Sequence, residues 1–169
     1  AAHAKANPSG PITGRGWIET HWPEKRFPTR ADLDAVVADR PVFLERADGH
    51  AAVANSKALA LGGITRATRD PSGGRIERDA RGEATGMLID AAMALVEDEL
   101  PEPSAADKRR ALELGAARTA AMGWTGVHDM SVSAEELSLL DALAGEKKLP
   151  IRVDAYLDLA AAQRVLTSG

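Results

Sequence analysis

The stretch from Asp48 to Asn55 is the first place in this sequence that could bind a ligand. It follows an apolar run at 42–44, which is typical of a short buried strand. Residues 51–61 are rich in Ala and Leu, which predicts a helix. Polar groups at the carboxyl end of a strand lie where α/β proteins usually bind ligands. The pattern therefore predicts that His50 and Asn55 lie on the first turns of this helix and point into one cavity. In the alternative, Asp48 merely caps that helix and His50 is solvated.

His128 and Asp129 form a second candidate, at the end of a strand predicted over 124–129. Neighbouring residues in a strand point to opposite faces, so one of the two lines a site while the other secures the following loop. A metal ion needs three or more protein ligands. The chain has no cysteine, and its histidines form no H-x-H or H-x-x-x-H pair: His3, His21, His50 and His128. We therefore expect no complete metal site within these residues.

Trp17 and Trp22 lie close together in a chain that is only 4% aromatic. With Glu19 between them, they could form the apolar wall of a pocket, although packing in the core is an equal alternative. The Gly14–x–Gly16 pair before them lacks the third glycine of a dinucleotide fingerprint. The sequence also has no phosphate-binding P-loop, no G-x-S-x-G motif and no convincing Ser/His/Asp arrangement.

The overall composition excludes several classes of protein. The chain has 169 residues, 44% of them hydrophobic, with a net charge of −4. An acidic chain without a basic face does not suit nucleic acid or an anionic membrane, so we expect neither as a partner. No apolar run approaches the ~20 residues of a membrane span, and no signal peptide is recognisable, so we expect a cytoplasmic protein. A full (β/α)₈ barrel, typically ~250 residues, does not fit in this length.

The pattern of elements divides the chain into three parts. Residues 1–13 have little periodicity and are expected to be a loose leading segment. Residues 14–103 are expected to form an α+β subdomain with three main features. These are a short helix capped by Thr29 and Asp32, an exposed hairpin with arms at 75–78 and 83–88, and a helix over 89–99.

Residues 104–169 have a more regular pattern. Ser104 and Asp107 predict the cap of a long helix, and Ser133 with Glu136 predicts another. Strands are expected at 124–129 and 151–157, with a short helix after the second. Alternating helices and strands are typical of parallel α/β units. The fold class predicted from the pattern is therefore α/β.

Several blocks of the sequence, taken together, resemble one conserved stretch of family 3 amidohydrolases, in the YtcJ-like group of metal-dependent hydrolases. The Asp48-Gly49-His50 run with Asn55-Ser56-Lys57-Ala58-Leu59 is specific to that group. The blocks occur in the expected order from residue 14 onward: Gly14-Arg15-Gly16-Trp17 with Trp22, 28–34, 41–44, 46–59, 73–76, 85–90 and 123–130.

The resemblance implies a metal-bearing (β/α)₈ barrel and a catalytic divalent metal, zinc by expectation. The family's ligand set is an H-x-H pair, a lysine or acid, two later histidines and an aspartate, and none of these can be placed here. The chain is therefore expected to be an internal segment: part of a (β/α) barrel with an α+β insertion. Residues 104–169 then supply the βα units of the incomplete barrel, with 125–129 and 151–157 as adjacent strands.

The activity implied by the resemblance is hydrolysis of a non-peptide C–N bond in a small amide-type substrate by metal-activated water. This segment would supply pocket and scaffold but no metal ligand, and would be inactive alone. Individual catalytic roles are not assigned. The expected polar pocket groups are Asp48, His50 and Asn55, with Trp17 and Trp22 as the apolar wall and His128 near the barrel mouth.

Two expectations distinguish this hypothesis from its alternative, a free-standing α/β module that binds a ligand or a partner without catalysis. Such a module would be a cooperatively unfolding monomer. A barrel segment instead exposes strand edges and apolar helix faces, so it is expected to be marginally stable or to associate, as a homo-oligomer would.

Overall fold

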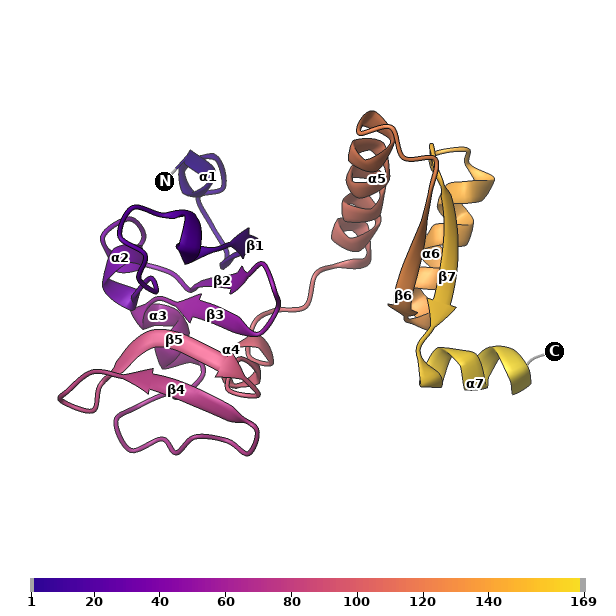
Figure 1. The fold of residues 1–169 in the computed structure, drawn as a ribbon. Coiled ribbons are helices and arrows are strands. Elements are labelled where there is room, and N and C mark those ends of the chain that lie inside the picture. The colour runs from indigo at the N-terminus through magenta and orange to yellow at the C-terminus, as the bar shows by residue number, and fades with distance from the viewer. Residues whose placement is uncertain (1, 168–169) are drawn as a thin grey trace. The chain divides into compact units, whose positions relative to one another are not determined.

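The computed structural model describes residues 2–167, and the chain divides into two compact units, Ala1–Pro101 and Glu102–Gly169 (Figure 1). The elements of the first unit are α1 (Ala2–Ala6), β1 (Ile12–Trp17), the 3₁₀ helix η1 (Glu19–His21), α2 (Arg30–Asp34), β2 (Val42–Arg46), β3 (Ala51–Ala54), α3 (Ser56–Leu61), β4 (Gly74–Arg78), β5 (Ala84–Asp90) and α4 (Ala94–Glu97). Those of the second unit are α5 (Ala105–Ala121), β6 (Gly126–Val132), α6 (Ala134–Gly145), β7 (Arg152–Leu157) and α7 (Leu159–Thr167).

The first unit is built on a five-stranded sheet of order β1-β2-β3-β5-β4. β1 and β2 run parallel, and the other neighbouring pairs are antiparallel. The central strand β3 is buried on both faces. Ala52 and Ala54 belong to the larger core cluster, which also includes residues of α3. Ala51 and Val53 belong to a second cluster, against which Trp17 packs.

The helix predicted over 51–61 is therefore wrong in its first part, where the chain forms β3, and correct in its second part, where it forms α3. Alanine favours a helix locally, but that preference is weak. Pairing of β3 with β2 and β5, together with burial on both faces, decides the conformation instead.

The predicted hairpin is confirmed, since β4 and β5 pair around a turn in which Asp79 accepts from the backbone N–H groups of Arg81 and Glu83 at 2.9 Å each. Its expected exposure is wrong for β5, most of which is buried against β3. The helix predicted over 89–99 is also too long. β5 continues to Asp90, and α4 covers only Ala94–Glu97.

The segment that the sequence predicts to be loose, 1–13, contains a short helix and the start of a strand. Residues 2–6 form α1, and β1 begins at Ile12 alongside β2. The cap predicted at Thr29 and Asp32 is confirmed as a capping box that begins α2. None of the helices described here is long and apolar enough to cross a membrane.

The second unit confirms the predicted alternation of helices and strands, and with it the α/β class. The capping boxes at Ser104 and Ser133 are both present. β6 and β7 are parallel, and their register sets His128 beside Asp154 and Met130 beside Tyr156. These four residues are exposed, whereas Val127 and Asp129 of β6 and Val153, Ala155 and Leu157 of β7 are partly covered.

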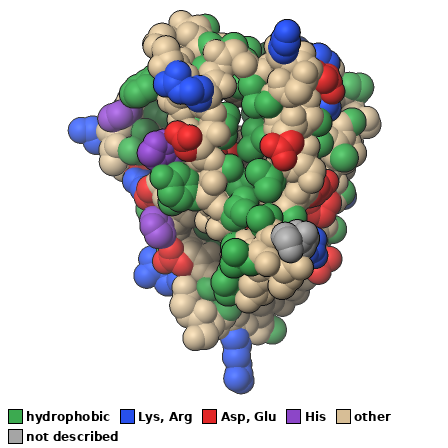
Figure 2. Space-filling view, turned by 90° about the vertical axis from the view of Figure 1, so that its right-hand side faces the viewer, with side chains coloured by type: hydrophobic (Ala, Val, Ile, Leu, Met, Phe, Trp, Pro, Cys, Tyr) green, Lys and Arg blue, Asp and Glu red, His purple; other side chains and the backbone are tan. Residues whose placement is uncertain are grey.

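The surface of the second unit carries several large hydrophobic side chains. Met122 is 70% exposed, Trp124 62% and Leu159 77%. Figure 2 shows hydrophobic side chains in patches among charged ones on the face that it presents. Large contiguous apolar patches are rare on monomeric proteins unless they meet a partner or another part of the same chain.

Candidate functional site

A charged cluster lies where β2 ends, and Arg46 is its centre. Arg46 Nε donates to Glu19 Oε2 at 2.8 Å and Nη2 donates to Glu19 Oε1 at 2.9 Å, so the ion pair is bidentate. Nη1 of Arg46 donates to Asp48. The side chains of Arg46 and Glu19 are only 19% and 12% exposed. The hydrogen bond between them lowers the pKa of Glu19 and raises that of Arg46.

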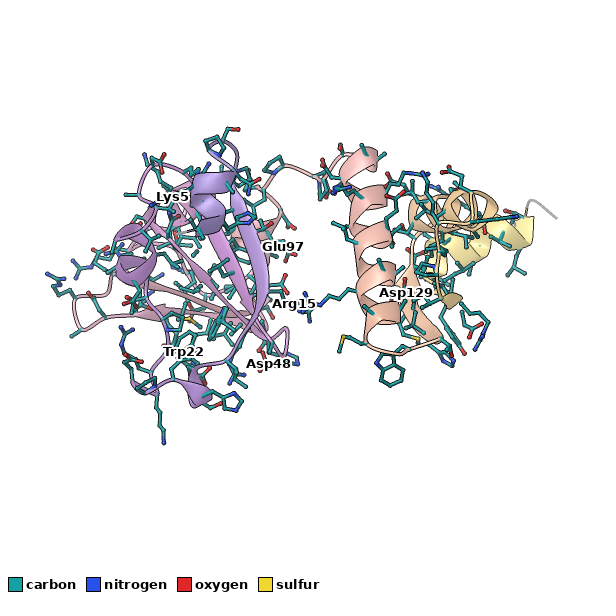
Figure 3. The ribbon with its side chains drawn as sticks, turned by 90° about the horizontal axis from the view of Figure 1, so that it is seen from above. Lys5, Arg15, Trp22, Asp48, Glu97 and Asp129 are labelled. Carbon is teal, nitrogen blue, oxygen red and sulfur yellow. The ribbon has the colours of Figure 1, made fainter. Side chains whose placement is uncertain are left out.

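Asp48 shapes the tight turn between β2 and β3. Its Oδ1 accepts the backbone N–H of His50 at 3.1 Å, which lowers the pKa of Asp48. Gly49 has φ +78°, and a Cβ there would lie 3.2 Å from Nη2 of Arg15. Figure 3 shows Arg15 and Asp48 on the same side of this unit. The alternative in which Asp48 caps a helix is wrong, because a strand follows the turn.

His50 projects from this turn toward the end of β5. The antiparallel register pairs Ala51 with Ile89, which sets His50 opposite Asp90. His50 Nδ1 lies 2.9 Å from Asp90 Oδ1, and the Asp90 backbone N–H donates to the His50 carbonyl at 3.1 Å. The His50 side chain is 77% exposed. We call Glu19, Arg46, Asp48, His50 and Asp90 the turn cluster.

The two tryptophans lie beside the turn cluster. Trp17 and Trp22 have ring centroids 5.8 Å apart with planes tilted by 31°. Trp17 Nε1 donates to the Leu44 carbonyl at 2.8 Å, and its ring packs against the second core cluster. The Trp22 backbone N–H donates to the Glu19 carbonyl at 2.9 Å. Four of the residues selected from the sequence are thus brought to one end of the sheet: Trp17, Trp22, Asp48 and His50.

Asn55 does not join them. It lies at the other end of β3 from His50, and its side chain is fully buried. The expectation that His50 and Asn55 share the first turns of one helix is wrong, because β3 separates them.

All of the hydrogen-bonding capacity of Asn55 is used within the first unit. Oδ1 accepts from the backbone N–H groups of Val42 at 3.0 Å and Ala58 at 2.9 Å. Nδ2 donates to the carbonyls of Val37 and Arg40, at 2.8 Å each. A side-chain amide has two donors and one oxygen with two lone pairs, so no group is left for a ligand. Asn55 therefore caps the N-terminus of α3 and fixes the loop before β2.

His128 belongs to the second unit. Its Nε2 lies 3.6 Å from Asp154 Oδ2, and its ring is 5.5 Å from that of Tyr156. It lines a groove of about 480 Å³ with Trp124 and Met122. His128 is thus available to a ligand, on the exposed face of the β6–β7 pair.

The residues described here do not by themselves fit a metal ion. Among residues 2–167, no three or more His, Asp or Glu side chains come together in a group that could hold one. Isolated pairs such as His50 with Asp90 offer too few ligands for a divalent metal.

Asp90 and Arg46 are functional candidates that the sequence pattern alone does not single out. Asp90 lies 40 residues from His50, and Arg46 lies 27 residues from Glu19. No local periodicity links residues so far apart. The available signal is that both lie in sequence blocks that carry the family resemblance, at 46–59 and 85–90.

Solved structures place this fold among the metal-dependent hydrolases. An uncharacterised metal-dependent hydrolase from Pyrococcus horikoshii OT3 matches 99% of this chain with a TM-score of 0.65 and 27% sequence identity. The match covers 32% of that protein.

The chain belongs to the amidohydrolase family, whose sequence profile matches residues 1–168. It is 39% identical over 122 residues to the putative amidohydrolase YtcJ of Bacillus subtilis, covering 72% of this chain and 23% of that protein. It is 38% identical over 153 residues to N-substituted formamide deformylase of Arthrobacter pascens, covering 88% of this chain and 28% of the enzyme. The resemblance drawn from the sequence is confirmed, and the chain spans about a quarter of the length of these relatives.

Proposed function

We propose that this chain is a segment of a metal-dependent amidohydrolase that hydrolyses a non-peptide C–N bond in a small amide-type substrate. The observation that carries the proposal is the likeness, over 88% of the chain, to a protein named as an N-substituted formamide deformylase. Removal of a formyl group from a substituted nitrogen breaks such a bond.

The segment's own contribution is a pocket and a scaffold. In the proposed enzyme, β6 and β7 are neighbouring strands of a (β/α)₈ barrel, and their exposed face, which carries His128, lines its interior. The first unit is an insertion that carries the turn cluster and the two tryptophans, Trp17 and Trp22. Because the described residues do not fit a metal, we assign them no step through it. The divalent metal, zinc in this proposal, is held by other parts of the longer enzyme.

The roles of individual residues follow from their exposure and hydrogen bonds. His50 is exposed and contacts the substrate directly, while Trp22 covers an apolar part of it. Arg46 and Asp48 hold the turn that carries His50. We leave Asn55 out of the substrate contacts, because its side chain is buried and saturated.

A segment exchange tests this proposal. The matching region of the Arthrobacter deformylase is replaced by this chain, and hydrolysis of an N-substituted formamide is measured with zinc and after chelation. We expect zinc-dependent turnover. His50→Ala in the exchanged enzyme should lower kcat/KM at least tenfold, whereas His21→Ala, an exposed histidine of η1 outside the turn cluster, should change it little. A folded, zinc-loaded exchange enzyme without turnover contradicts the proposal.

The isolated chain provides two further tests. Metal analysis of the purified 169 residues should find no equimolar zinc, and a tightly held equimolar zinc would contradict the assignment of the ligands elsewhere. The exposed Trp124, Met122 and Leu159 predict association in size-exclusion chromatography. A monomer with one cooperative melt favours the free-standing binding module instead.

A further inference from the structure

The contact between His50 and Asp90 determines where the histidine carries its proton. His50 Nδ1 and Asp90 Oδ1 are 2.9 Å apart, a hydrogen-bonding distance. An ionised carboxylate can only accept a hydrogen bond, so the hydrogen must lie on Nδ1. In the neutral imidazole, Nε2 then has no hydrogen and carries a free lone pair.

The backbone of Asp90 independently supports this arrangement. Its N–H donates to the His50 carbonyl at 3.1 Å, so the two residues are joined twice. Asp90 also has φ +46°, a left-handed conformation that costs free energy in most residues and that Asp tolerates better than most. Strained backbone of this kind is often found at functional sites.

We propose that Asp90 is a positioning residue that holds His50 in the Nδ1–H form, so that Nε2 accepts a hydrogen bond from an N–H or O–H group of the substrate. The identity of the substrate class rests on the proposed function above. Among amide-type substrates, those with a hydrogen on the reacting nitrogen can donate it to Nε2. His50 then recognises that hydrogen, and Asp90 acts only through His50.

The second unit supplies a control within the same molecule. His128 and Asp154 are also an exposed His–Asp pair, but their closest atoms are 3.6 Å apart and make no hydrogen bond, and the nitrogen that faces the carboxylate is Nε2. His128 should therefore not be held in the Nδ1–H form.

Nitrogen-15 NMR of the 169-residue chain reads the tautomer of each histidine directly. We expect His50 in its neutral form to show a protonated Nδ1 and an unprotonated Nε2. Asp90→Ala should shift His50 toward the Nε2–H form, Asp90→Asn should retain part of the preference because its amide oxygen still accepts, and Asp154→Ala should leave His50 unchanged. His50 in the Nε2–H form in the unmodified chain overturns the inference, even if no variant folds.

Kinetics of the exchanged deformylase test the substrate side. Asp90→Ala should raise KM for an N-monosubstituted formamide about fivefold, the effect of one neutral hydrogen bond, with a smaller change in kcat. An N,N-disubstituted formamide, which has no N–H to offer, should show no such change. Equal losses for both substrates overturn recognition of the N–H. The tautomer is read from the chain alone, so its result does not depend on whether the proposed function holds.

Discussion

Glu19 and Arg46, 27 residues apart in the sequence, form a bidentate ion pair that joins η1 to the end of β2. The pair is mostly covered, and the same guanidinium also holds Asp48 in the next turn. The segment that carries Trp22 is thereby fixed against the strand pair that carries Trp17. Removal of the Arg46 cation should leave the carboxylates of Glu19 and Asp48 facing each other without their shared partner.

Arg46→Gln should therefore separate the indole rings of Trp17 and Trp22. Two indoles with centroids 5.8 Å apart couple their transitions and give a paired band in the far-ultraviolet circular dichroism spectrum. We expect this band to be lost in Arg46→Gln while the helical signal is retained. The matched control is Arg109→Gln, which removes a comparable cation bound to Glu146 in the second unit. A band that survives Arg46→Gln would show that the tryptophans pack together without the ion pair.

The same ion pair predicts a dependence of stability on pH. The pKa of Glu19 is lowered by its hydrogen bond from Arg46, and that of Asp48 by the backbone N–H of His50. The unfolded chain therefore binds protons at a higher pH than the folded chain does. The stabilisation is present above the ordinary carboxyl pKa values of about 4 and is lost as the pH falls through the lower folded values.

Urea unfolding between about pH 3 and pH 6 measures this dependence. The free energy of unfolding should fall toward acid, and Glu19→Gln should flatten the slope because it removes one of the groups that titrate differently in the two states. An unchanged slope in Glu19→Gln would contradict the role assigned to this carboxylate.

Asn55 makes a different prediction, because its four hydrogen bonds serve stability. Asn55→Ala leaves the N–H of Val42 and the carbonyls of Val37 and Arg40 buried without that partner, and it removes the cap of α3. We expect a loss of about 2–4 kcal/mol in the free energy of unfolding. Ser104→Ala, which removes an exposed cap, should cost about 1 kcal/mol in the same assay. Equal losses would show that the buried bonds of Asn55 contribute little.

Local rules predicted the parts of this molecule that depend on neighbours in the sequence. The capping boxes at Thr29, Ser104 and Ser133 were predictable because a cap joins residues three positions apart. The turn at 79–82 was predictable for the same reason. The strand at 51–54 was not, since its Ala-rich sequence favours a helix until the neighbouring strands pair with it.

The candidate site likewise has parts that depend on neighbours in the sequence and parts that depend on strand pairing. The Asp48–His50 turn and the two tryptophans are readable as motifs. The place of Asn55 cannot be predicted in this way, because it depends on whether the chain after His50 forms a helix or, as the structure shows, β3. The partner of His50 depends on the pairing of β3 with β5, which brings together residues 40 positions apart. Side-chain partners of this kind follow from sheet register, and register is set by tertiary packing.

Gly86 and Gly115 provide a matched pair for testing the packing of the first unit. Gly86 has φ +109°, and a Cβ there would lie 2.6 Å from both the Ala54 carbonyl oxygen and the Arg30 backbone nitrogen. Gly86→Ala adds backbone strain to this collision and should destabilise the chain by at least about 2 kcal/mol. Gly115 lies within α5, and a Cβ there would point into open space, so Gly115→Ala should stabilise the chain by about 0.5–1 kcal/mol. Urea unfolding of both variants measures the difference. A tolerated alanine at Gly86 would mean that Ala54 of β3 and Arg30 of α2 do not lie as close to β5 as these distances require.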